Sequence, residues 1–563
     1  MLLNPNKHNR YYPDDRSRDI MLKTIEHFEK RGKEKLKEDD HERVWYSDFL
    51  DFIKKEKIFY TLLTPEKYGQ DTRWDTWRNC EFSEILGFYG LCYWYTWQVS
   101  ILGLGPIWIS NNEDAKKKAA SYLNDGEIFA FGLSEKSHGA DIYSSDMILT
   151  NLGEGNYRAN GGKYYIGNAN KARMVSTFGI MDDPEEYVFF AADSQHKNYE
   201  LIKNVCDSQN YVAQFNLSDY PILESDILAK GEEAWDMALN TINIGKYNLG
   251  WASIGICTHA FYESITHASN RILYKKPVTD FPHIRRLFVD AYSRLYAMKV
   301  FSLRASDYMR SASREDRRYL LYNPMVKMKV TMQGENVIDD LWDVIAAKGF
   351  EKDMFFSSAA RDIRALPKLE GTAHVNMALI VKFMANYFFN PAEFPEIPKR
   401  DDIKNDDFLF NQGTTKGLGK IQFHDYNIIY NQFDLPNINI FKEQIEALKD
   451  FLMNATPDKD QQRDIDFLLN LGEIFCLAPY GQLILENAQI LNLDNDIIDQ
   501  IFDFMVRDLS KFALQLYLKP SSSDKQKEFA LKMIRKPNVS QERFNNVWEN
   551  HVYVLNGAYE MNP

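Results

Sequence analysis

The sequence predicts an α+β fold in which helical regions flank a β-rich central domain. Apolar residues recur at helix-like intervals among charged ones up to about residue 126. Short β-rich runs separated by Gly, Asn and Asp replace this pattern between residues 127 and 231. Helical periodicity returns at residue 232 and persists through the rest of the chain.

The bulk composition bounds the class of protein. The chain has 563 residues, enough for several domains, and 45% hydrophobic with 26% charged residues is an ordinary globular mixture. The net charge of −13 argues against nucleic acid or an anionic membrane as the main partner. Five cysteines without a CxxC pair predict reduced, buried thiols and a cytoplasmic protein. We expect no targeting peptide and no integral membrane segment, because neither an apolar leader nor a run of 18 apolar residues is present.

The first two domains are expected over residues 1–126, which are helical, and 127–231, which form the β-domain. Within the helical domain, a pair of apolar stripes predicts helices: Leu22, Ile25 and Phe28, then Phe49, Phe52 and Ile53. The β-domain shows the runs IFAFGL, YRANGGKYYIG, MVSTFGI and YVFFAA. A hairpin turn is predicted at Asn160-Gly161-Gly162, between two β-rich runs.

The remainder is predicted to be a helical bundle over residues 232–390 and an appended helical domain over 408–563. Long helical stretches are expected at 233–273, 284–311 and 325–348, with a fourth after Thr372. Residues 391–407 are a linker by composition, rich in proline and charge. In the appended domain the apolar stripes are Phe441, Ile445, Leu448 and Leu452, then Ile497–Leu518.

Several common signatures of chemistry are incomplete in this chain. Gly103-Leu104-Gly105 lacks the third glycine of a dinucleotide fingerprint, and Gly417-Leu418-Gly419-Lys420 lacks the remainder of a phosphate loop. The histidines show no metal-ligand spacing, so no metal site is expected. No GxSxG nucleophile elbow is present.

Four ordered local patterns, quoted from the sequence, together resemble one family. They are FGLSEKSHGAD at residues 131–141, NGGKYYIGN at 160–168, Arg271 followed by YKKP at 274–277, and Arg361-Asp362 leading to LEGT at 369–372. The order and spacing resemble those of acyl-CoA dehydrogenases from about residue 20 to 390. The related acyl-CoA oxidases share the fold and also carry an appended helical domain. The resemblance implies an acyl-CoA dehydrogenase-like fold with FAD between the β-domain and the bundle.

The resemblance also assigns the base. It implies that Glu370 takes the α-proton of an acyl thioester, on CoA or a carrier protein, while the β-hydride passes to flavin N5. Such chemistry needs a carboxylate in a dry pocket, where desolvation raises its pKa. Glu370 is expected at the start of a helix, where a glutamate is most often a capping residue. The flanking Arg361-Asp362 and Gly371-Thr372 motif favours its role as the base instead. Gly371 and Lys246 are the expected substrate contacts.

The resemblance further implies which residues hold FAD. Ser134, expected in a β-run, would hydrogen-bond the isoalloxazine, and Arg271 would pair with the pyrophosphate. The other expected FAD contacts are Leu133, Ala140, Tyr165, Ile166, Gly167, Thr372 and His374. Several of these and their neighbours depart from the family pattern: Ala140 replaces a serine, Gly167 a threonine, Pro282 a glutamine, and Ala346-Ala347 a Gly-Gly pair.

The predicted function is therefore FAD-dependent α,β-dehydrogenation of an acyl thioester in lipid metabolism. The resemblance implies an electron-transferring flavoprotein or similar acceptor, and a homodimer or homotetramer. Three alternatives stay open. An acyl-CoA oxidase is favoured by the His138-Gly139 pair. A nitroalkane-oxidase-like enzyme would use an aspartate base, whereas this chain has Glu370. A non-catalytic partner subunit is favoured by the departures at the FAD site.

Overall fold

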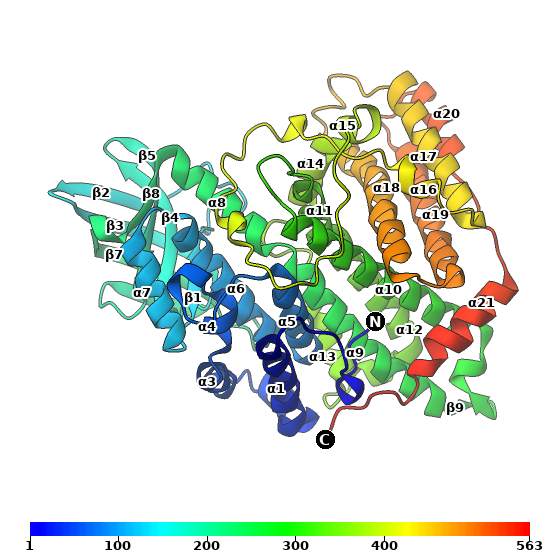
Figure 1. The fold of residues 1–563 in the computed structure, drawn as a ribbon, viewed down its shortest axis with the longest axis horizontal. Coiled ribbons are helices and arrows are strands. Elements are labelled where there is room, and N and C mark those ends of the chain that lie inside the picture. Colours follow the sequence, from blue (N-terminus) through cyan, green and yellow to red (C-terminus); the bar gives the residue numbers. More distant parts are fainter. The chain divides into compact units, whose positions relative to one another are not determined.

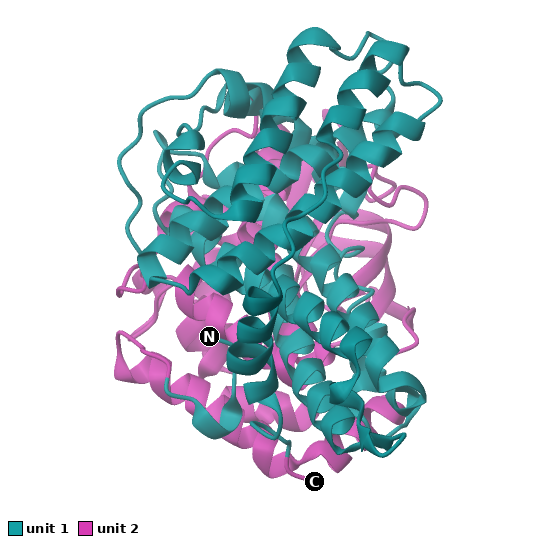
Figure 2. Ribbon diagram, turned by 90° about the vertical axis from the view of Figure 1, so that its right-hand side faces the viewer, with its two compact units in different colours: residues 1–9, 249–400, 417–561 teal, residues 10–248, 401–416, 562–563 magenta.

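The computed structural model describes residues 1–563 and confirms the predicted α+β class, with many helices and one large sheet (Figure 1). The chain forms two compact units, which are coloured separately in Figure 2. Unit 1 contains residues 1–9, 249–400 and 417–561. Unit 2 contains residues 10–248, 401–416 and 562–563.

Unit 2 begins with seven helices, in the region where the periodicity predicted helical structure. They are α1 (Asp15–Arg31), α2 (Lys33–His41), α3 (Ser47–Lys55), α4 (Ile58–Leu63), α5 (Thr76–Tyr89), α6 (Leu91–Ile109) and α7 (Glu113–Asn124). Side-chain caps fix several of their starts: Asp14 accepts the backbone N–H of Ser17, and Asn112 that of Ala115. α5 and almost all of α6 are buried, so they form the centre of this unit.

The sheet of unit 2 has eight strands. They are β1 (Phe129–Gly132), β2 (Ile148–Gly153), β3 (Asn156–Gly167), β4 (Met174–Asp182), β5 (Glu185–Ala192), β6 (Tyr199–Asn204), β7 (Val212–Leu223) and β8 (Ile227–Lys230). Seven of them follow the order β6-β7-β3-β2-β4-β5-β8, and β1 pairs in parallel with β4. α6 packs against β1 and β4, which places the buried helix beside the sheet.

The hairpin turn predicted at Asn160-Gly161-Gly162 is wrong, because these residues lie inside the continuous strand β3. The turn joins β2 to β3 instead, between Gly153 and Asn156. The two glycines let neighbouring segments pack closely against β3. A Cβ on Gly161, at φ +148°, would lie 2.7 Å from the Cα of Met147. A Cβ on Gly162 would lie 2.6 Å from Oδ1 of Asn216.

Helix α8 (Gly231–Gly245) completes unit 2 together with the segment 401–416. This segment is fixed to the unit by hydrogen bonds. The carboxylate of Asp406 accepts the N–H of Thr76 at 2.7 Å, at the start of α5. Asn240 of α8 donates to the carbonyl of Gly413 at 2.7 Å, and Thr415 donates to Asp236, one turn earlier, at 2.7 Å.

Unit 1 contains the helical bundle. Its elements are α9 (Asn248–Asn270), β9 (Ile272–Leu273), β10 (Lys276–Pro277), α10 (Pro282–Arg310), α11 (Tyr319–Met325), α12 (Thr331–Ile345), α13 (Phe355–Asp362), α14 (Ala373–Ile380) and α15 (Met384–Phe389). A π-helical turn, Val326–Val330, joins α11 to α12. π-helical turns inside helices are frequent at functional sites.

The C-terminal helices belong to the same unit. They are α16 (Asn427–Tyr430), α17 (Pro436–Asn454), α18 (Ile465–Leu491), α19 (Asn495–Leu518), α20 (Asp524–Met533) and α21 (Gln541–Val547). The stripe predicted on α17 is buried at Phe441, Ile445 and Leu448. Arg294 of α10 donates to both carboxylate oxygens of Asp508 on α19, at 2.9 and 3.0 Å. This ion pair ties the C-terminal helices to the bundle.

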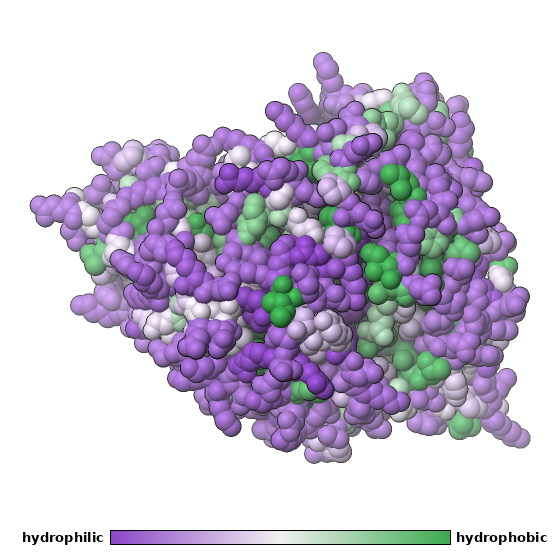
Figure 3. Space-filling view, viewed as in Figure 1, coloured by the Kyte–Doolittle hydropathy of each residue, from purple (hydrophilic) through white to green (hydrophobic).

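One helix, α18, is long and apolar enough to cross a membrane by length and composition. In its most apolar window 83% of the helix is buried inside the structure. It packs against α10, α14 and α19 and is thus the central helix of the C-terminal group. The face drawn in Figure 3 is mostly hydrophilic, with separate small hydrophobic patches.

Candidate active site

Glu370 lies in the loop between α13 and α14, and its backbone adopts a left-handed conformation that non-glycine residues rarely adopt. Its φ is +52° and that of Gly371 is +82°. The predicted position at the start of a helix is wrong by a few residues: α14 begins at Ala373, and Thr372 is its N-cap. A non-glycine residue at positive φ costs on the order of 1–3 kcal/mol and is typical of functional sites. Oε2 of Glu370 is shielded from solvent.

The carbonyl groups around Glu370 are held by side chains of unit 1. The ammonium group of Lys327, in the π-helical turn, donates to the carbonyls of Pro367 at 2.7 Å and Gly371 at 2.6 Å. Asn376 of α14 donates to the carbonyls of Gly371 at 3.1 Å and Thr372 at 3.0 Å. Lys327 was not among the predicted site residues; its only local signal was a lysine within an apolar helical stretch.

The helix that follows Glu370 rests on the C-terminal helices. Met377 of α14 contacts Gly472 of α18, and its sulfur lies 3.8 Å from Sγ of Cys476. Burial raises the pKa of Glu473 on α18, and Lys329, whose ammonium lies 4.0 Å away, partly offsets that rise. Two other predicted site residues, Thr372 and His374, are exposed at the start of α14.

Arg271 follows directly after α9, where its backbone N–H donates to the carbonyl of His267 at 3.0 Å. Its side chain is exposed and forms no ion pair. The two-stranded β9-β10 ribbon comes next, with Tyr274 and Lys275 at its turn in positive φ. The structure thus presents the Arg271 guanidinium to solvent at a helix end.

In unit 2, two segments predicted to belong to one site lie side by side. Ser134 follows β1, in a loop rather than in the predicted β-run. Its hydroxyl donates to the carbonyl of Tyr164 at 2.8 Å, and its own carbonyl accepts the Tyr164 N–H at 3.0 Å. The carbonyl of Leu133 accepts a 3.1 Å bond from the ammonium of Lys163. The structure therefore joins Leu133 and Ser134 to β3.

The other predicted residues of β3 show different surroundings. Tyr165 has φ +63°, and its side chain is 61% exposed, whereas Ile166 is buried. A Cβ on Gly167 would lie 2.7 Å from Cε1 of Tyr95 on α6, so packing against that helix excludes a threonine here. Ala140 is exposed in the loop before β2. Lys246 is buried at the C-terminal end of α8.

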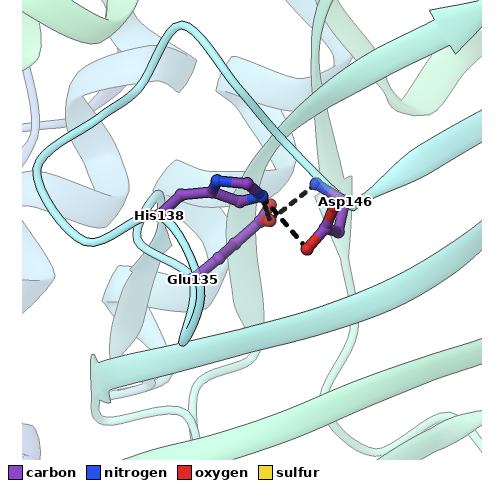
Figure 4. Close-up of side chains that lie close together, drawn as sticks. All are labelled: Glu135, His138 and Asp146. Atoms are coloured by element: carbon purple, nitrogen blue, oxygen red, sulfur yellow. Dashed lines mark hydrogen bonds and ion pairs between the residues drawn. The ribbon is translucent and has the colours of Figure 1, made fainter.

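Glu135, His138 and Asp146 form a compact cluster next to Ser134 (Figure 4). Nε2 of His138 lies 3.1 Å from Oδ2 of Asp146, and the N–H of Asp146 donates to Glu135 at 2.6 Å. The buried ammonium of Lys163 lies 2.6 Å from Oε1 of Glu135. Burial raises the pKa of Glu135, but the charge and hydrogen bond of Lys163, together with hydrogen bonds from Ser145 and Asp146, leave the pKa below its usual value.

The ligand atoms of this cluster lie within 4.8 Å of one another, so both its residue types and its spacing resemble a set of metal ligands. The Lys163 ammonium already provides the cation that balances Glu135. His138 and Asp146 pair with each other at the edge of the loop. The arrangement therefore fixes the 135–146 loop to β3, the strand that carries Tyr165.

Part of the chain matches a protein-family model, and the chain is similar in sequence to two reductases. Residues 233–385 match the family model described as acyl-CoA dehydrogenase, C-terminal domain. The chain is 22% identical to a 3-(aryl)acrylate reductase of Clostridium sporogenes, over 59% of this chain and 89% of that protein. It is 21% identical to the caffeyl-CoA reductase-Etf complex subunit CarC of Acetobacterium woodii, over 53% of this chain and 79% of that protein.

A solved structure extends the similarity over nearly the whole chain. The structure of an acyl-CoA dehydrogenase complexed with FAD from Bacillus anthracis superposes with a TM-score of 0.72 at 16% identity. The match covers 98% of each chain, so the C-terminal helices are included. The fold is therefore shared beyond the bundle and the β-domain.

Proposed function

Since the chain belongs to the acyl-CoA dehydrogenase superfamily, we propose that it is an FAD-dependent enzyme that removes hydrogen from the α and β carbons of an acyl thioester. Glu370 is the proposed base for the α-proton. The observation that carries this proposal is the Glu370 loop, in which a glutamate at positive φ, with Oε2 shielded from solvent, precedes the capped helix α14. Shielding from water is what raises the proton affinity of a carboxylate base.

The residues present fit FAD. In unit 2 the Ser134 hydroxyl and the exposed ring of Tyr165 lie on two segments that hydrogen bonds join, which gives a polar group and an aromatic face for a flavin ring. In unit 1 the exposed guanidinium of Arg271 suits a pyrophosphate, because a forked, always-charged donor can bind two oxygens. Ala140 and Gly167 offer no hydroxyl group, so fewer side-chain hydrogen bonds would hold FAD than with the serine and threonine of the family pattern. When bound, FAD supplies the acceptor for the β-hydride.

Proton removal makes the thioester oxygen more negative, and that charge needs a donor. The backbone N–H of Glu370 is the proposed protein donor, an electrostatic stabilisation of the enolate. Gly371 and Glu370 lie in the same loop, so the hydrogen bond from Lys327 to the Gly371 carbonyl orients both the carboxylate and the backbone N–H of Glu370. Lys246 and Gly371 stay as proposed substrate contacts.

The proposed acceptor is an electron-transferring flavoprotein, and the proposed assembly is a homodimer or homotetramer. One similar protein is named as a subunit of a reductase-Etf complex, which supports this acceptor. The C-terminal helices do not favour an oxidase, since the similar structure that also contains them is named an acyl-CoA dehydrogenase. The substrate head group is CoA or a carrier protein.

The test is flavin reduction by acyl thioesters under anaerobic conditions. The purified protein should bind FAD, and acyl-CoAs of graded length should bleach its visible band. Glu370→Gln should keep the FAD and lose at least about 10²–10⁴-fold in the reduction rate, because the amide cannot accept a proton. Glu549→Gln, an exposed glutamate of the same unit, is the matched control and should react as the wild type does. A folded protein that stays colourless with excess FAD would instead support a non-catalytic partner subunit.

A further inference from the structure

Lys327 is a buried cation whose hydrogen bonds go to the loop of Glu370. Its residue is 0% exposed, and it lies in the π-helical turn between α11 and α12. Its ammonium donates to the carbonyl of Pro367, three residues before Glu370, and to that of Gly371, one residue after it. A buried ammonium is costly unless such bonds satisfy it, so the side chain and the loop fix each other.

The loop needs such a support. Glu370 and Gly371 both have positive φ, and a strained backbone of this kind persists only where its surroundings determine it. Lys327 binds both ends of the segment 367–371, with distances of 2.7 and 2.6 Å. Asn376 adds a second donor to the Gly371 carbonyl, at 3.1 Å, but it reaches only the C-terminal side of Glu370.

We propose that Lys327 is a positioning residue that holds the Glu370 loop so that its carboxylate meets the α-proton of the substrate. This inference rests on the proposed function, and it assigns to Lys327 no contact with the substrate. A base displaced by about 1 Å can lose on the order of 10²-fold in rate. Loss of the Lys327 ammonium should therefore slow proton removal much more than it weakens binding.

The same helical turn provides a matched control. Lys329 is also buried, at 3% exposure, and it carries the same charge two residues further on. Its ammonium lies 4.0 Å from Oε2 of Glu473 and 5.3 Å from the ring centre of Phe512. Both of these partners belong to the C-terminal helices, so Lys329→Met removes a buried charge without removing a bond to the Glu370 loop.

The experiment compares Lys327→Met, Lys327→Gln and Lys329→Met as FAD-loaded full-length proteins. Three quantities are measured with an acyl-CoA that reduces the wild type: its dissociation constant, the limiting rate of flavin reduction, and exchange of its α-protons with deuterated solvent. Thermal melting and FAD content report the fold. Lys327→Met should lose about 10²-fold in the reduction rate and in α-proton exchange, with binding changed less than about threefold.

Lys327→Gln keeps an amide donor but loses the charge and some of the reach, so its rates should lie between those of the wild type and of Lys327→Met. It keeps the test decisive if the methionine variant does not fold. Lys329→Met should retain α-proton exchange within about threefold of the wild type, since no bond to the loop is removed. Equal losses in the Lys327 and Lys329 variants, or a Lys327→Gln that reacts at the wild-type rate, would overturn the proposal. Retained activity in Glu370→Gln would overturn the proposed base itself, which is a separate result.

Discussion

Met377 occupies the space that a side chain at residue 472 would need. A Cβ built on Gly472 of α18 would lie 2.3 Å from Sδ and 2.8 Å from Cγ of Met377. Met377 belongs to α14, whose N-cap lies two residues after Glu370. The glycine therefore lets a C-terminal helix support the helix that follows the candidate base.

We expect Gly472→Ala to destabilise the protein and to slow flavin reduction. Overpacking of this kind costs about 1–3 kcal/mol, more than the roughly 1 kcal/mol that alanine gains over glycine in a helix. Displacement of α14 should also lower the limiting reduction rate. Gly419→Ala is the control, since nothing lies within 4 Å of a Cβ there. Urea unfolding and stopped-flow reduction measure both effects; unchanged stability and rate in Gly472→Ala would show that Met377 moves aside at no cost.

Arg271→Ala should weaken FAD binding while leaving the fold intact. The guanidinium is exposed and has no ion-pair partner, so its removal breaks no ion pair. A charge-assisted bond to pyrophosphate contributes about 1.5–3 kcal/mol, which corresponds to a roughly 10- to 100-fold higher dissociation constant. Fluorescence titration of the apoprotein with FAD gives this constant. Arg314→Ala, at another exposed arginine of the unit, should bind as the wild type does. Equal constants in all three proteins would mean that the pyrophosphate lies elsewhere.

The sequence predicted most of the helical architecture, because amphipathic periodicity and capping residues are local properties. Phe441, Ile445 and Leu448 of the stripe on α17 are buried as expected, whereas Leu452 is partly exposed. Helix α19 spans Asn495–Leu518 where 497–518 was predicted. The Gly161-Gly162 pair was misread, since glycine serves both turns and close approach. Only the position of Met147 and Asn216 distinguishes the two uses, and these residues are remote in the sequence.

The candidate site was only partly predictable, for a related reason. The motifs located Glu370, Ser134 and Arg271, which the structure places in two loops and at a helix end. The support of Glu370 by Lys327 joins residues more than forty positions apart, and no local pattern encodes such a bond. Gly167 could be explained only once Tyr95 was seen beside it.

Asp340 of α12 should make the protein less stable as the pH rises. Burial raises its pKa from 3.8 to about 7; Asp290 and Asp339 add to the rise, and Arg294 and Arg507 oppose it. Below about pH 4 the Asp340 carboxyl is protonated in both the folded and the unfolded state, so it does not lower the free energy of unfolding. Between about pH 4 and 7 only the unfolded chain ionises, so the free energy of unfolding falls as the pH rises, and the loss is complete above pH 7.

Asp340→Asn should therefore be more stable than the wild type at pH 8, by up to about 4 kcal/mol, and equally stable at pH 4. The control is Asp339→Asn, whose side chain is 53% exposed and pairs with Arg364. This variant should not gain stability at pH 8. Denaturant unfolding at the two pH values checks both expectations. A gain for Asp340→Asn that is the same at pH 4 and pH 8 would mean that the effect is one of packing and not of titration.

The last prediction concerns the fate of the electrons and separates a dehydrogenase from an oxidase. Both would use Glu370 in the same way, so only the reaction of the reduced protein with oxygen distinguishes them. The His138-Gly139 pair favoured the oxidase, and in the structure both residues make contacts within the 135–146 loop. Nε2 of His138 pairs with Asp146 at 3.1 Å, and the N–H of Gly139 donates to the carbonyl of Glu135 at 3.0 Å, so both residues fix the loop.

Under the proposed function we expect slow reoxidation. The protein is reduced under anaerobic conditions with an acyl-CoA that it turns over, and is then mixed with air-saturated buffer while product is still bound. The flavin band should return over minutes with little peroxide, because bound product keeps oxygen from the flavin and electrons await a protein acceptor. Addition of an electron-transferring flavoprotein should restore the band quickly in the same mixture. Return of the band within a second, with stoichiometric hydrogen peroxide, would identify an oxidase. His138→Ala would then show whether the 135–146 loop governs the access of oxygen to the flavin, since opening the loop should change the rate of reoxidation.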